Sequence, residues 1–156
     1  MNDHQLASKI KEICKERGIT IHPAESGKNR ANREQKAIWI NEILDPGDFA
    51  AALHEIGHVM CDPARPPRNP RETLDAETNA WQWALDYNGD DFDRRGWRRL
   101  HDSLHQYYVA LMDTSLPAYA LLVRAEEKDP SIRPRVSEFG APSLGSLAKK
   151  TTKPKP

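Results

Sequence analysis

The sequence predicts an α+β fold in which helices predominate, and three observations lead to this prediction. Five segments place apolar residues three and four positions apart, which is the period of an amphipathic helix. Two short runs rich in β-branched residues lie between the first and second of these segments and predict a small sheet. Hydrophobic residues make up 38% of the chain and charged residues 29%, which is sufficient for one core in 156 residues.

The N-terminal part of the chain predicts one helix followed by two short strands. Residues 3–17 are expected to form the helix, and Gly18 ends it. The apolar positions of this helix share one face: Leu6, Ile10, Ile13 and Cys14. Residues 19–22 and 37–41 are expected to be strands, because both are short and β-branched and a polar loop separates them.

A second helix is predicted to begin after Asp45, a favourable N-cap, with Pro46 at its first position. It is expected to end at Asp62, because a proline follows and disfavours helical backbone in the residue before it. His54 and His58 lie on one stripe of this helix. The adjoining stripe is expected to face the core: Phe49, Leu53, Ile56 and Met60.

Further helices are predicted over residues 70–87, with Asn69 as the N-cap, and over about 92–112 and 117–128. Four arginines in the 92–112 segment follow three aspartates, so they are expected to form ion pairs within the chain rather than to contact nucleic acid. These arginines are Arg94, Arg95, Arg98 and Arg99.

Composition and patterning set the domain organisation and exclude several classes of partner. One domain is expected over residues 1–130, and residues 131–156 are expected to be a flexible tail, because apolar periodicity fades there. Lys plus Arg and Asp plus Glu number 23 each, which gives no electrostatic case for direct binding to nucleic acid or to a membrane surface. No apolar run approaches the roughly 20 residues of a membrane span, no signal peptide is recognised, and the two cysteines cannot form a disulfide framework. A cytoplasmic protein is therefore expected.

One motif suggests chemistry, the segment His54-Glu55-Ile56-Gly57-His58, which is an HExxH pattern inside an independently predicted helix. Residues four apart share a helix face, so both imidazoles can bind one Zn²⁺. Glu55 lies about 100° around the axis, which suits a general base acting on a zinc-bound water. Gly57 in mid-helix costs about 1 kcal/mol relative to alanine and predicts the close approach of another backbone.

A catalytic zinc ion takes three protein ligands, so the sequence must supply one more. Glu77 is the predicted third ligand, since it lies nineteen residues after His58 on the following helix, with the small residues Ala80 and Ala84 on its face. Cys61 lies about 10 Å along the axis from the first histidine, too far to share the ion, and is expected to be a small buried hydrophobe. Two earlier acidic residues of the 70–87 helix are expected to face solvent: Glu72 and Asp75.

These motifs resemble the ImmA/IrrE family of zinc metallopeptidases, which occur in phages and mobile elements beside repressor proteins. The resemblance covers residues 37–87 and is carried by the segments AIWIN, FAAALHEIGH and DAETNAWQWA, although the last is unusually rich in tryptophan. It implies a zincin-like metallopeptidase core, with a small sheet beside the HExxH helix and additional C-terminal helices. It also implies Zn²⁺ held by His54, His58 and Glu77, with Glu55 as the general base.

The expected function is zinc-dependent hydrolysis of a peptide bond in a regulatory protein such as a DNA-binding transcriptional repressor. The alternative is a catalytically silent binding or sensor module that sequesters a partner, and the intact Glu55 favours hydrolysis. A structural zinc site is disfavoured, because such sites use four Cys or His ligands. The donor that would stabilise the oxyanion stays open among five residues: Tyr87, His101, His105, Tyr107 and Tyr108.

Overall fold

The computed structural model describes residues 2–89 and 92–139, and this part of the chain has an α+β fold that is mainly helical. The predicted class is therefore confirmed. The described residues form six helices and three strands: α1 (Asp3–Arg17), β1 (Thr20–Pro23), β2 (Arg30–Asn32), β3 (Ala37–Ile40), α2 (Pro46–Cys61), α3 (Pro70–Tyr87), α4 (Arg94–Tyr108), α5 (Pro117–Lys128) and α6 (Val136–Phe139).

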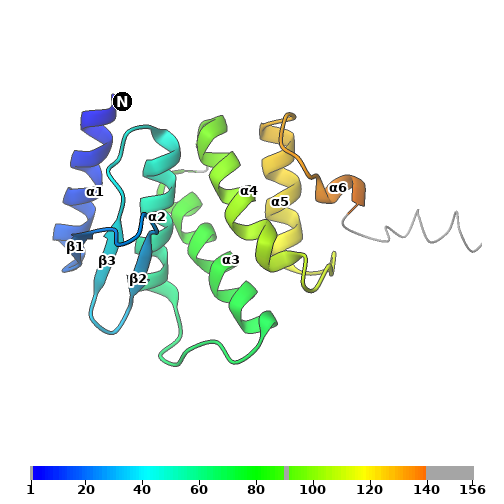
Figure 1. The fold of residues 1–156 in the computed structure, drawn as a ribbon, viewed down its shortest axis with the longest axis horizontal. Coiled ribbons are helices and arrows are strands. Elements are labelled where there is room, and N and C mark those ends of the chain that lie inside the picture. The colour runs from blue at the N-terminus through cyan, green and yellow to red at the C-terminus, as the bar shows by residue number, and fades with distance from the viewer. Residues whose placement is uncertain (1, 90–91, 140–156) are drawn as a thin grey trace, which may run out of the picture.

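The three strands form one small sheet in the order β1-β3-β2. β1 runs parallel to β3, and β2 runs antiparallel to it. The sheet lies against α1 and α2 at one end of the molecule, and α3, α4 and α5 follow on the other side of α2 (Figure 1). The edge strand β2 is an addition to the prediction, since its residues were expected to belong to a polar loop.

Helix α2 lies at the centre of this arrangement and contacts α1, the sheet, α3 and α4. Its boundaries follow the predicted signals, because the Asp45 carboxylate accepts a hydrogen bond from the Asp48 backbone N–H at 2.9 Å. The predicted apolar stripe is buried except at its last position, where Met60 is 39% exposed. Cys61 is also exposed, so the prediction of a buried thiol was wrong. Both residues lie in the last turn, where the helix leaves the core.

The contact between α2 and α3 is unusually close at Gly57, as predicted. A Cβ atom at this position would lie 3.0 Å from the carbonyl carbon and from the Cα of Ala80, and nearer still to the carbonyl oxygen. These atoms belong to the α3 backbone, which cannot move aside as a side chain can. Glycine therefore allows the two helix backbones to meet at this level.

The C-terminal helices differ from the prediction in two places. α4 ends at Tyr108 rather than near residue 112, where Met112 has the left-handed backbone angle φ 47°. Ile132 and Val136 are buried, so these two residues of the segment expected to be a flexible tail, residues 131–156, pack against the core. Ile132 and Val136 are isolated apolar residues without helical or strand periodicity, so the sequence pattern did not predict their burial. The rest of the predicted tail, residues 140–156, lies outside the described residues.

The arginines of α4 form ion pairs within the chain, as predicted. Arg94 and Arg98 both bind Asp129 at the end of α5, and their N–O distances are 3.0 and 2.7 Å. The other two pairs are Arg95 with Asp93 and Arg99 with Asp48. Two of the three acidic partners therefore come from other helices.

Within residues 2–89 and 92–139, no helix combines the length and the apolar character that crossing a bilayer requires.

Candidate metal centre

The three predicted ligands meet at one point between α2 and α3. His54 and His58 extend from successive turns of α2, and Glu77 reaches them from α3. The two Nε2 atoms lie 3.2 Å apart. Glu77 places Oε1 3.1 Å from Nε2 of His54 and Oε2 2.9 Å from Nε2 of His58. One ligand atom from each residue lies within 4.8 Å of the other two, so the group is close enough to hold a metal ion.

This spacing fits a small tetrahedral ion. Bonds of about 2.0–2.1 Å in tetrahedral geometry separate neighbouring ligand atoms by about 3.3 Å. The 3.2 Å between the two Nε2 atoms comes close to that edge length, and each nitrogen also lies 2.9 to 3.1 Å from one of the two Glu77 oxygens. Both imidazoles are buried and the Glu77 carboxylate is largely buried, so water competes little for these atoms. The donor set is therefore suited to a divalent cation.

The pKa shifts of Glu77 and His58 indicate that the three candidate ligands favour a bound positive charge. Burial would raise the pKa of Glu77, but its hydrogen bonds to His54 and His58 outweigh burial and lower that pKa to about 2. Burial would lower the pKa of His58, but hydrogen bonds to Asp62 and Glu77 raise it to about 10. The pKa of His54 is lowered by its burial. The carboxylates thus favour a cation here, either a proton on His58 or a metal ion.

Glu55 lies beside this group without belonging to it. Its side chain is buried, with only 8% of the residue exposed, and burial raises its pKa to about 7. A carboxylate with a pKa near the working pH can both accept and return a proton. The structure therefore places a buried carboxyl group next to the three candidate ligands.

The candidate ligands open into a cleft of about 630 Å³. One wall comes from the segment leading into β2 and from β2 itself, through Lys28, Asn29 and Arg30. The opposite wall comes from α4, through Arg99, Ser103, Gln106 and Tyr107. The cleft is therefore lined by polar groups from segments far apart in the sequence.

Of the five donors left open by the sequence, Tyr107 is the one that lines the cleft. Burial raises its pKa, and the charges of Glu77 and Glu55 add to this shift, so the phenol keeps its proton. His101 is buried and paired with Glu126 at 2.8 Å, and the ring of His105 stacks on it. The other two tyrosines are engaged elsewhere, Tyr87 against Trp83 and Tyr108 against Tyr119.

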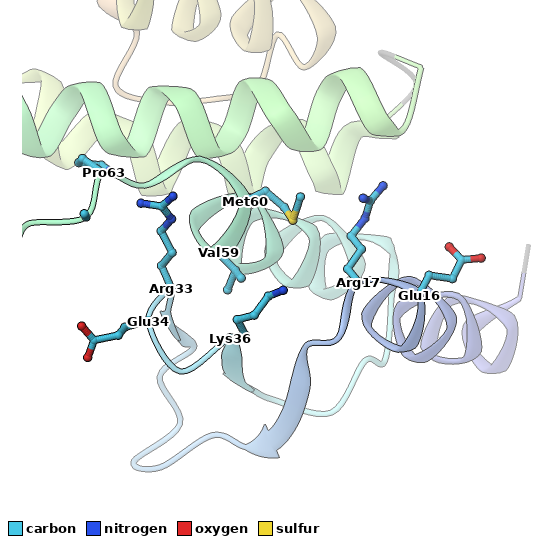
Figure 2. A pocket seen from close by; sticks show the side chains of 9 residues that line it. Glu16, Arg17, Arg33, Glu34, Lys36, Val59, Met60 and Pro63 are labelled. Atoms are coloured by element: carbon cyan, nitrogen blue, oxygen red, sulfur yellow. The ribbon is translucent and has the colours of Figure 1, made fainter.

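A second cavity of about 700 Å³ lies near the C-terminal ends of α1 and α2 and shares no lining residue with the cleft. Figure 2 shows Lys36 extending toward Met60 and Arg33 toward Pro63, whereas Glu16 and Glu34 point away. Although this cavity is slightly larger, none of the predicted site residues lines it. The cleft that holds the histidines is therefore the better candidate for chemistry.

One residue of the site was missed as a functional residue by the sequence. The carboxylate of Asp62 lies 2.8 Å from Nδ1 of His58, on the ring nitrogen that faces away from Glu77. The sequence used Asp62 only as the end of a helix. Its position four residues after His58 was the available signal, because such residues share a helix face.

Comparisons of the chain with known protein families, with curated proteins and with solved structures find no match.

Proposed function

We propose that the protein is a zinc-dependent endopeptidase with a zincin-like core of the ImmA/IrrE type. The observation that carries the proposal is the convergence of His54, His58 and Glu77, with Glu55 beside them. Two imidazoles and one carboxylate are a common ligand set of catalytic zinc, whereas structural sites use four ligands. The small sheet beside α2 and the helices beyond α3 agree with the arrangement that the family resemblance implies.

In the proposed reaction, Zn²⁺ held by the three ligands would act as a Lewis acid that polarises a peptide carbonyl and acidifies water. Glu55 accepts the proton from the attacking water and passes it to the leaving amine. Tyr107 donates its O–H to the carbonyl oxygen on which negative charge develops.

The substrate class follows from the reaction and from the family resemblance. The cleft of about 630 Å³ lies open between β2 and α4, so it can receive a segment of a polypeptide. The resemblance directs the proposal to a regulatory protein, such as a DNA-binding repressor encoded near this protein.

The test compares the zinc-loaded protein with a Glu55→Gln variant, using such a repressor as the substrate. We expect cleavage by the wild type and a loss of about 10²- to 10⁴-fold in rate for the variant, with equal zinc content in both. Equal turnover by the two proteins would reject Glu55 as the base. Absence of cleavage by the wild type, with zinc bound, would reject the endopeptidase and leave the binding module as the function.

A further inference from the structure

We propose that Asp62 is a positioning residue of the metal centre, which holds the His58 ring with Nε2 directed at the ion. The inference rests on the proposed metal site. It concerns how that site is built and does not depend on the reaction. Asp62 is the first residue after α2 and touches none of the other ligand atoms within hydrogen-bonding distance.

The backbone of Asp62 is held in a conformation that suits this role. It is extended, with φ −62° and ψ 143°, and Pro63 disfavours any continuation of the helix at this residue. The Asp62 N–H donates to the carbonyl oxygen of His58 at 3.0 Å. The backbone and the side chain of Asp62 therefore both bind His58.

The chemistry of imidazole explains why the ring needs a partner. A neutral histidine that binds a metal through one nitrogen carries its proton on the other nitrogen. Nε2 of His58 faces Glu77 and His54, so it is the nitrogen that would bind the ion, and Nδ1 would then carry the proton. The Asp62 carboxylate, at 2.8 Å, accepts the hydrogen bond from this N–H. It thereby selects the tautomer that leaves Nε2 free for the metal and fixes the orientation of the ring.

His54 has no such partner among the described residues, and it provides an internal comparison. Its Nδ1 is buried without a hydrogen bond. The ring instead stacks on the indole of Trp81, with a centroid distance of 4.2 Å and an interplanar angle of 18°. Trp81 is in turn held by a hydrogen bond from its N–H to the Ser103 hydroxyl at 3.2 Å. Packing orients one ligand, and a carboxylate orients the other.

A role as a helix cap alone would make a different prediction. The cap contact is made by the backbone N–H of Asp62, which every residue except proline offers. The carboxylate makes no bond to the end of the helix. Removing the side chain therefore tests the contact to the imidazole ring and leaves the backbone cap in place.

The first test measures zinc affinity on the metal-free protein by competition with a chromophoric chelator. Asp62→Ala is expected to weaken zinc binding by about 10- to 100-fold. Asp62→Asn is expected to lose less, because its amide oxygen can still accept the Nδ1 hydrogen bond. The control is Asp75→Ala, which removes an equal charge from an exposed side chain that pairs with Arg71 on α3, and its affinity should match the wild type within about twofold. An Asp62→Ala affinity within about twofold of the wild type would overturn the inference.

The second test reads the tautomer directly, by ¹⁵N NMR of the imidazole nitrogens in the zinc-loaded protein. In the wild type, His58 should carry its proton on Nδ1, in slow exchange with water. In Asp62→Asn, this proton should exchange faster, with little change at His54. An unprotonated Nδ1 in the wild type would contradict the proposal. Neither measurement uses a substrate, so a failure of peptide cleavage would leave this inference intact, and normal zinc binding by Asp62→Ala would leave the proposed hydrolysis intact.

Discussion

Replacing Gly57 by alanine tests how the contact between α2 and α3 positions the three candidate ligands. The added Cβ would lie 3.0 Å from two backbone atoms of Ala80 and less than 3.0 Å from its carbonyl oxygen. Ordinary van der Waals contact begins at 3.4 Å, so the helices must separate by more than 0.4 Å, the difference between 3.4 and 3.0 Å. Glu77 lies one turn before Ala80 on the same helix and would move away from the histidines.

The expected loss of stability follows from two opposing effects. Alanine in a helix interior is more favourable than glycine by about 1 kcal/mol. Overpacking costs about 1–3 kcal/mol or more, and contact with a rigid backbone belongs at the upper end of that range. We therefore expect Gly57→Ala to lower the free energy of unfolding by about 2 kcal/mol. For a chain of this length, this corresponds to a fall in Tm of roughly 4–8 °C.

The assay is urea denaturation of the metal-free protein, followed by measurement of zinc affinity. Gly57→Ala should lower the midpoint without changing the slope, and it should also weaken zinc binding. Gln82→Ala serves as the control, since it alters an exposed side chain of α3 and should change stability by no more than about 0.5 kcal/mol. If Gly57→Ala is as stable as the wild type or more stable, the close contact does not exist and the reasoning is refuted.

Two further predictions concern the cleft and the C-terminal helices. Tyr107→Phe should lower kcat by about 10²- to 10³-fold without loss of zinc, whereas Tyr87→Phe, outside the cleft, should retain the wild-type rate; equal rates for both variants would exclude Tyr107 as the donor. Asp129 is buried and accepts hydrogen bonds from Ser131, Arg94 and Arg98, and these bonds lower the pKa of its carboxyl group. The contribution of Asp129 to the free energy of unfolding is therefore complete at neutral pH and is lost as the pH falls below about 4. Asp129→Asn should lower the free energy of unfolding at pH 7 by about 1.5–3 kcal/mol, and this free energy should then fall less steeply between about pH 4 and 2 than in the wild type, as measured by urea titration. An unchanged dependence of the unfolding free energy on pH in this range would contradict the role of Asp129.

Helix boundaries could be predicted where the signal was local. Asn69 and Asp45 cap their helices through contacts with residues three positions on, so the neighbouring sequence contains the whole signal. The strand β2 could not be predicted, because two of its three residues, Arg30 and Asn32, are polar, and the segment becomes a strand only by pairing with β3. The burial of Ile132 could not be predicted either, because no apolar periodicity in the neighbouring sequence indicates it.

The candidate site shows the same division between local and tertiary information. His54 and His58 could be paired from the sequence, since their spacing alone places them on one helix face. Glu77 required the further assumption that two consecutive helices cross, which Gly57 supported. Tyr107 could not be selected from five candidates, because only the packing of α4 against the cleft distinguishes it.

The central claim is that one divalent ion is bound jointly by His54, His58 and Glu77. Zinc K-edge absorption spectroscopy on the protein loaded with one equivalent of zinc tests this claim most directly. We expect a four-coordinate ion with two imidazole nitrogens and carboxylate or water oxygens at about 2.0–2.2 Å. The imidazole scattering should fall by half in His58→Ala. A spectrum without imidazole scattering, or one that His58→Ala leaves unchanged, would contradict the account.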